Sequence, residues 1–139
     1  MAHLNRAVAV LRIVGEDLEP DEISALLGRQ PSRSQRKGQE IQTNPGRPPR
    51  IAKFGNWRMD AQDTEPENLD QQVVEMLNGL TTDLAVWRDL SSRYKVDVFC
   101  GWFMRESNEG VDIAPETLLA LGQRNIALAL DIYAPDSDA

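Results

Sequence analysis

Alternating apolar residues predict four main strands in this chain. Ala7–Val14 has apolar side chains on both of its faces, which predicts an interior strand of a sheet. Three further segments show alternation, and we expect strands at Phe54–Met59, Val96–Met104 and Asn125–Tyr133. Val111–Ile113 is a shorter candidate that we expect to pair back on the sheet as an edge strand.

A pattern of proline, acidic residues, leucines and glycine occurs twice and predicts two short helices. The first copy, residues 18–28, opens its helix at Pro20, and the second copy, residues 113–122, opens its helix at Pro115. Proline suits the first helical turn, acidic side chains are favoured beside the free N–H groups, and glycine ends the helix. Each copy follows a strand candidate, so the pattern indicates two strand–helix halves around one core. The second copy is one residue shorter, and general helix-forming signals explain the likeness as well as duplication does.

The strongest helical pattern lies between these two halves. Apolar residues recur there at i, i+4, i+7, i+8 and i+11: Leu69, Val73, Met76, Leu77 and Leu80. Thr64–Glu67 has the spacing of a capping box, which predicts the start of this helix. We expect a second helix after it that turns Leu84, Trp87 and Leu90 inward and ends near Tyr94.

The order of elements predicts the fold class. Strand, helix, strand, two helices, strand, helix and strand indicate an α+β domain with a mostly antiparallel sheet and helices on one face. A split β-α-β, ferredoxin-like arrangement with a helical insertion fits this order best. The length of 139 residues favours one domain over residues 1–139, with a frayed acidic tail at 134–139.

Charge is distributed unevenly along the chain. The formal net charge is −7, yet residues 29–53 hold seven basic residues and one acidic residue, a local charge of +6 that leaves −13 for the remainder. Prolines and glycines in this segment predict a long basic loop with a hairpin around Asn44-Pro45-Gly46. Its simplest interpretation is a solvated loop that pairs with the acidic remainder.

The functional interpretation of the same loop is an anion-binding site. Arg33, Arg36 and Lys37 lie close together in sequence beside Gly38, and arginine holds phosphate or carboxylate through two parallel hydrogen bonds. Trp57 follows on the next strand candidate and would add an apolar wall. Duplex DNA is a poor candidate ligand, because the acidic remainder repels a polyanion and the predicted helices begin with acidic residues.

The inventory of catalytic and metal-binding residues is thin. His3 is the only histidine and lies near the terminus, and Cys100 lies inside a strand candidate as a small buried hydrophobe, so we expect no catalytic residue. Glu106, Glu109 and Asp112 are close in sequence but match no calcium-loop pattern, and a solvated acidic turn explains them better than a metal site. No phosphate-binding glycine motif is present, and we expect no cofactor and no metal.

Several short motifs together resemble a known family. They are Leu18-x-Pro20 with Glu22-Ile23, Gly28, Pro31, Lys37-Gly38, Gly55-x-Trp57, the Leu69–Leu80 helix and Asp131-Ile132-Tyr133. This arrangement, over residues 5–134, resembles a family of small bacterial single-domain proteins that is catalogued only as a domain of unknown function. The resemblance implies a bacterial protein that consists of this domain, and it implies no reaction, cofactor or catalytic residue. The proline-rich stretch Thr43–Arg50 resembles a local elaboration in a variable loop.

These observations lead to three hypotheses of different classes. The first is a non-enzymatic cytoplasmic binding protein whose basic loop contacts an anionic ligand or partner; the single cysteine and the absence of a bilayer-spanning segment favour the cytoplasm. The alternative is an immunity-type or antitoxin-like protein that neutralises a basic partner through Glu106, Glu109, Asp112 and the acidic helix starts. A third is an enzyme that works through paired carboxylates. An exposed sheet edge would also permit a homodimer.

Overall fold

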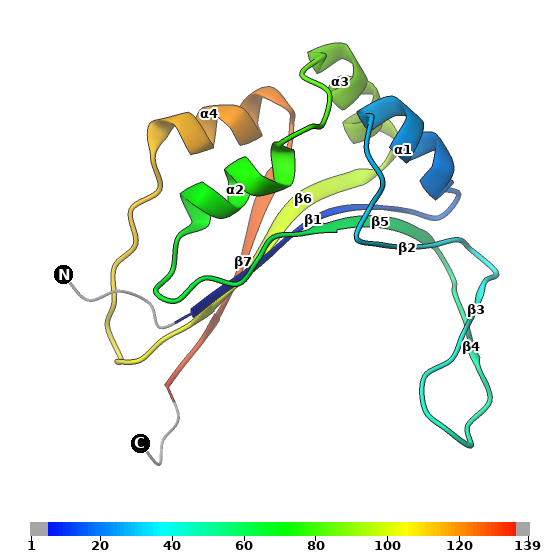
Figure 1. The fold of residues 1–139 in the computed structure, drawn as a ribbon, viewed down its shortest axis with the longest axis horizontal. Helices are drawn as coiled ribbons and strands as arrows, with labels where there is room; N and C mark the ends of the chain where they lie inside the picture. The colour runs from blue at the N-terminus through cyan, green and yellow to red at the C-terminus, as the bar shows by residue number, and fades with distance from the viewer. Residues whose placement is uncertain (1–5, 136–139) are drawn as a thin grey trace.

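The computed structural model describes residues 6–135, in which four helices cover one face of a five-stranded sheet (Figure 1). The strands of the sheet are β1 (Arg6–Gly15), β2 (Arg33–Gln35), β5 (Gly55–Asp60), β6 (Lys95–Phe103) and β7 (Ala127–Tyr133). The helices are α1 (Pro20–Leu27), α2 (Leu69–Leu77), α3 (Leu84–Arg93) and α4 (Pro115–Gln123). A separate hairpin consists of β3 (Glu40–Ile41) and β4 (Arg50–Ile51). No helix in this range combines the length and the apolar character that crossing a bilayer requires.

The sheet has the strand order β2-β5-β1-β6-β7 and is mostly antiparallel. β1 is antiparallel to both β5 and β6, β2 is antiparallel to β5, and β7 alone pairs in parallel, with β6. Consequently α1 joins two strands, β1 and β2, that run in the same direction with β5 between them. The pair α2–α3 joins β5 to β6 with β1 between them. The connection through α4 differs, because β6 and β7 are direct neighbours.

The predicted fold class is confirmed: this is an α+β fold with a mostly antiparallel sheet and helices on one face. The ferredoxin-like arrangement itself is not confirmed, because α4 and β7 extend the sheet beyond that plan through a direct parallel pairing. The prediction of an edge strand at 111–113 is wrong, because these residues lead into α4 and pair with no strand.

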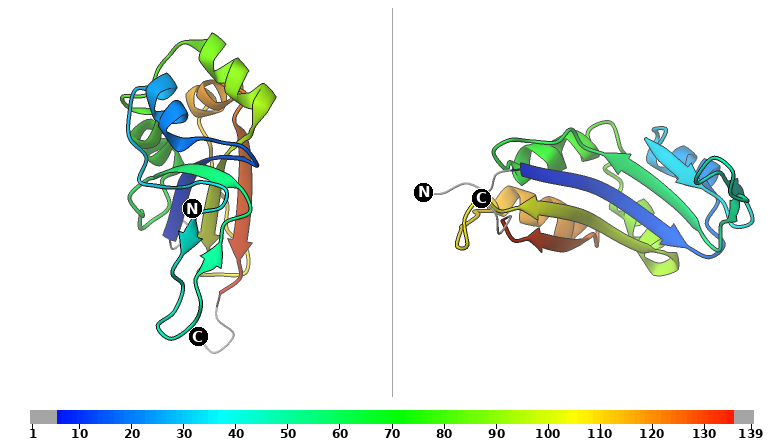
Figure 2. Two further views of the ribbon diagram at one scale, coloured as in Figure 1. Left: turned by 90° about the vertical axis from the view of Figure 1, so that its right-hand side faces the viewer. Right: turned by 90° about the horizontal axis from the view of Figure 1, so that it is seen from below.

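The segment predicted to be a long loop, residues 29–53, contains three short strands. β2 joins the main sheet, and β3 and β4 form the expected hairpin around Asn44-Pro45-Gly46, where the N–H of Arg47 donates to the carbonyl of Asn44. The hairpin projects from the sheet on the side away from the helices (Figures 1 and 2). Residues 136–139 of the predicted tail lie outside the described residues.

The start of α2 differs from the sequence prediction. Thr64 pairs with Ala7 through two backbone hydrogen bonds of 3.0 and 3.1 Å, so the sheet holds Thr64 in an extended segment. The helix starts later, at Leu69, with Asn68 as its N-cap, whose side chain accepts from the N–H of Gln71. Thr64 stabilises the segment just before the helix, because its hydroxyl accepts a hydrogen bond from the N–H of Asn68 at 3.0 Å. Prolines do open α1 and α4, as predicted.

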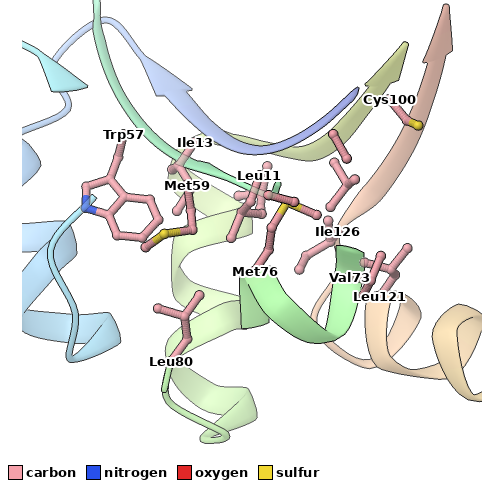
Figure 3. Packing of buried hydrophobic residues seen from close by; sticks show 14 of the residues in the cluster. Leu11, Ile13, Trp57, Met59, Val73, Met76, Leu80, Cys100, Leu121 and Ile126 are labelled. Atoms are coloured by element: carbon pink, nitrogen blue, oxygen red, sulfur yellow. The ribbon is translucent and has the colours of Figure 1, made fainter. Parts of the chain in front are cut away.

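The apolar core lies between the sheet and the helices (Figure 3). Leu11 and Ile13 of β1 and Trp57 and Met59 of β5 point toward the helices, where they meet Met76 and the other residues of the cluster. Each fully buried large aliphatic or aromatic side chain stabilises the fold by about 1.5–3 kcal/mol relative to exposure. Because side chains alternate along a strand, the residues between these positions lie on the opposite, uncovered face of the sheet.

One glycine fixes how closely β5 approaches the turn between β1 and α1. A Cβ atom at Gly55 would lie 2.3 Å from the carbonyl oxygen of Leu18, well inside any permitted contact. Only glycine fits here, and its fit brings the start of β5 against the segment that leads into α1.

Candidate anion-binding pocket

A row of three arginines crosses the uncovered face of the sheet. Arg33 of β2 lies directly opposite Arg58 of β5, and Arg58 lies directly opposite Arg12 of β1. The row ends on β6 with Asp97, which lies opposite Arg12. Like charges at directly opposed positions of an antiparallel pair destabilise a sheet, so the row needs compensating negative charge.

The two outer arginines have carboxylate partners. Arg12 donates from Nε and Nη2 to the two oxygens of Asp97 at 2.8 and 2.7 Å, and its guanidinium also lies over the ring of Phe99, 4.6 Å from the centroid. Arg33 donates in the same two-pronged way to Asp60 at 3.1 and 2.9 Å. The side chain of Asp97 is 4% exposed, so the Arg12 pair is the more deeply buried of the two.

Arg58, in the middle of the row, has no ion pair within residues 6–135. Partial burial lowers the pKa of its guanidinium, and the positive charges of Arg33 and Arg12 lower it further. The negative charges of Asp60 and Asp97 raise this pKa but do not reverse its direction. Arg58 therefore remains a charged donor group, partly withdrawn from water, in a locally positive environment.

A pocket of about 390 Å³ opens beside this row, between the main sheet and the β3–β4 hairpin. Its lining residues are three arginines, three residues with side-chain amides, one serine and one isoleucine: Arg33, Arg50, Arg58, Gln35, Gln39, Asn56, Ser34 and Ile41. Arg50 reaches the pocket from the hairpin and, like Arg58, makes no ion pair within the described part of the chain. Such a lining offers many hydrogen-bond donors and two unpaired positive charges to a negatively charged group.

The structure separates the residues that the sequence grouped as one site. Arg33 lines the pocket. Arg36 instead pairs with Glu19 and Asp21 at 3.1 and 3.0 Å, beside the start of α1.

Lys37 pairs with Glu16 at 2.7 Å, and the hydrogen bond it donates lowers the pKa of that carboxyl. Trp57 is fully buried on the helix-covered face, where its indole N–H donates to the hydroxyl of Ser24 at 3.0 Å (Figure 3). Of the four residues, only Arg33 belongs to the pocket, and Trp57 lies on the other side of the sheet from it.

Sequence reasoning missed Arg58 and Arg50, and it gave Arg12 no role. A signal was present, because Arg12 is a charged residue among alternating valines and Arg58 lies in the next long strand of the sheet. Linking the two required the register that places Arg58 opposite Arg12. Predicting Arg50 as a pocket residue would have required knowing that the β3–β4 hairpin lies beside β2 and β5.

The other candidate residues, the acidic segment and Cys100, have structural roles or exposed positions that need no chemical function. Glu109 accepts hydrogen bonds from the backbone N–H groups of Arg105 and Glu106 at 2.9 and 2.7 Å, so one carboxylate of the acidic segment stabilises its own turn. Glu106 and Asp112 are exposed in the loop before α4. Burial raises the pKa of the Cys100 thiol to about 12, which makes it unreactive at neutral pH. In residues 6–135 no cluster of three or more histidine, cysteine or acidic side chains is arranged to hold a metal ion.

Comparison with known proteins places the whole described fold in one family. The family model described as domain of unknown function DUF4279 matches residues 5–135, which includes every strand and helix of the structure. No curated protein and no solved structure matches the chain. The match agrees with the resemblance found from the short motifs. The chain belongs to the DUF4279 family.

Proposed function

We propose that this protein is a binding protein that holds an anionic group in the pocket between β2, β5 and the β3–β4 hairpin. The observation that carries the proposal is the guanidinium of Arg58, which lies between two like charges and has no carboxylate of its own. A bound anion would supply the missing negative charge. The paired neighbours Arg33 and Arg12 would keep the row rigid before the ligand arrives.

The lining narrows the chemistry of the ligand. Arg58 and Arg50 suit a carboxylate or phosphate, because each guanidinium presents parallel N–H donors to two oxygens. The amide of Asn56 suits an additional oxygen or nitrogen atom on the same molecule, and so do the amide oxygen of Gln35 and the amide nitrogen of Gln39, whose other amide atoms bond to Phe54 and Arg36. The volume of about 390 Å³ fits a small polar molecule or one charged side chain of a partner.

Calorimetric titration with inorganic phosphate and with citrate at low ionic strength tests this proposal. We expect both probes to bind the wild-type protein and binding to weaken by at least about tenfold in Arg58→Gln, because one charge-assisted hydrogen-bonding group is lost. Arg36→Gln is the matched control: it removes one positive charge as Arg58→Gln does, but Arg36 lies outside the pocket and is paired with Glu19 and Asp21. The control is expected to bind as the wild type does.

The double variant Arg36→Ala, Lys37→Ala separates this pocket from the site expected on the basic loop. If that double variant loses binding while Arg58→Gln retains it, the anion binds along the loop and the pocket is not the site. If neither probe binds the wild-type protein, or if Arg58→Gln binds them equally well, the proposal is wrong.

The cysteine content supports a cellular compartment for this function. A single buried cysteine needs no oxidising compartment, which supports the proposal that the protein works in the cytoplasm. We keep a bacterial origin as an expectation that rests on the resemblance to the family.

A further inference from the structure

The outer edge of β7 is a complete strand edge that the described fold leaves unpaired. β7 is the last strand of the sheet and pairs only with β6 (Figure 2). The carbonyl of Tyr133 accepts from the N–H of Met104, so the backbone groups of Tyr133 point toward β6. Because this direction alternates along a strand, the N–H and C=O groups of Leu128, Leu130 and Ile132 point outward.

The sequence of this edge lacks the residues that usually prevent pairing. Edge strands are commonly guarded by lysine, proline or a covering loop, whereas Ala127–Tyr133 contains no lysine, arginine or proline and only one charge, Asp131. Three of its apolar side chains are exposed, with 42% for Leu130, 53% for Ile132 and 44% for Tyr133, whereas Leu128 is half-buried against the core. A seven-residue apolar edge of this kind favours the addition of another strand.

Exposed apolar residues also gather on the helix above this edge. Five of the nine large hydrophobic side chains that are exposed in residues 6–135 belong to α4 and β7: Leu118, Leu119, Leu130, Ile132 and Tyr133. Glu116 and Ala120 of α4 line a groove against α2. At 100° per residue, Leu118 lies on the other side of α4, which faces away from α2 and toward the free edge.

We propose that β7 pairs with β7 of a second copy of this chain, antiparallel and centred on Leu130, to form one continuous sheet across a twofold axis. The strand is self-complementary in this register. Leu130 lies opposite its own copy, Leu128 opposite Ile132, Ala129 opposite Asp131, and Ala127 opposite Tyr133. The outward backbone groups of Leu128, Leu130 and Ile132 then all find partners on the other copy.

Other registers are less favourable for reasons that lie in the same strand. A centre on Asp131 would place two carboxylates directly opposite each other. A centre on Ala129 would place Tyr133 opposite Asn125, which lies outside the strand with a φ of 56°. Registers shifted by one residue would match inward-pointing with outward-pointing backbone groups.

The position of the helices agrees with this pairing. An antiparallel pairing about a twofold axis perpendicular to the sheet keeps both helical layers on the same side. The two copies of α4 then flank the axis, and the exposed Leu118 side chains face each other over the joined strands. Backbone pairing and apolar contact therefore act at the same place, independently of the anion pocket at the other end of the sheet.

Analytical ultracentrifugation of the full chain tests the pairing, over about 1 μM to about 1 mM, where interfaces of modest size associate. We expect the wild-type protein to dimerise. Leu130→Lys places two positive charges opposite each other at the centre, and we expect the dimer dissociation constant to rise by at least about tenfold. Ile51→Lys is the control, because Ile51 is 52% exposed on β4 at the far end of the molecule. Far-ultraviolet circular dichroism establishes that both variants are folded.

Cysteine cross-linking tests the register and does not depend on a destabilising variant. The two Cα atoms of residue 130 would lie about 5.5 Å apart in a hydrogen-bonded pair, within the range of a disulfide. We expect Leu130→Cys to form a disulfide-linked dimer under mild oxidation. Ile132→Cys should not form this disulfide, because residue 132 lies opposite residue 128 of the other copy. The two cysteines would then be separated by four residues along the strand direction, or about 13 Å.

The proposal is overturned if the wild-type protein stays monomeric up to the highest concentration, or if Leu130→Lys and Ile51→Lys dimerise equally well. A dimer in which Ile132→Cys cross-links and Leu130→Cys does not would overturn the register.

Discussion

Replacing Arg58 by glutamine should stabilise the empty protein. Arg58 lies directly between Arg33 and Arg12 in the cross-strand row, and both of those arginines are held in place by carboxylates. In the absence of a ligand its charge meets two like charges and no ion-pair partner of its own. Glutamine keeps a polar side chain of similar reach on the sheet surface and removes the repulsion.

The magnitude follows from the geometry of the row. A favourable cross-strand pair contributes about 0.2–1 kcal/mol, and like charges at the same positions act in the opposite direction; we take a cost of the same size for each of the two like-charged neighbours of Arg58. Its attraction to Asp60 and Asp97 offsets part of that cost. We therefore expect a gain of about 0.5–1 kcal/mol in the free energy of unfolding, which for a domain of this size raises the melting temperature by about 2–4 °C.

Urea denaturation at low and at high ionic strength measures this gain. Salt screens charges over about 10 Å at 0.1 M, so the difference between Arg58→Gln and the wild type should shrink as salt is added. Arg36→Gln, which removes a paired arginine, should lose between 0 and about 1 kcal/mol. If Arg58→Gln is less stable than the wild type, or if its gain is independent of salt, the repulsion assigned to the row is wrong.

Three further predictions concern buried and paired groups. Asp97→Ala leaves Arg12 without its buried partner and should cost about 3 kcal/mol in a urea titration; a loss below about 1 kcal/mol would contradict the pair's role. Cys100, whose thiol pKa is raised to about 12 by burial, should react with a thiol reagent at neutral pH only after unfolding, and rapid labelling of the native protein would refute its burial. The hydrogen bond from Lys37 lowers the pKa of Glu16, so any stability from this pair is present above the ordinary pKa of glutamate and is lost as pH falls through the lowered one. NMR titration should show that pKa rising toward its ordinary value in Lys37→Met, and no change would contradict the contact.

Local patterns in the sequence determined the types of element and most of their positions. The alternation in Ala7–Val14 and Val96–Met104 and the prolines of the repeated pattern predicted β1, β6, α1 and α4, because side-chain periodicity and helix capping depend on neighbouring residues only. The same alternation correctly put Trp57 and Met59 on one face of β5. Local reasoning was wrong at α2, where the pairing of Thr64 with the distant Ala7 overrode a capping-box spacing.

The candidate site depended on contacts between residues far apart in the chain, and only the tertiary structure decided it. The chain order places Arg12, Arg33 and Arg58 in three separate segments, and the strand order brings them side by side. The sequence showed a +6 segment, but it could not show which of those charges are neutralised. Glu16, Glu19 and Asp21 lie close to Arg36 and Lys37 only because β2 returns past the start of α1. Sequence periodicity thus determined which residues share a strand or helix face, while strand register determined which charges meet, because pairing joins residues that no local pattern connects.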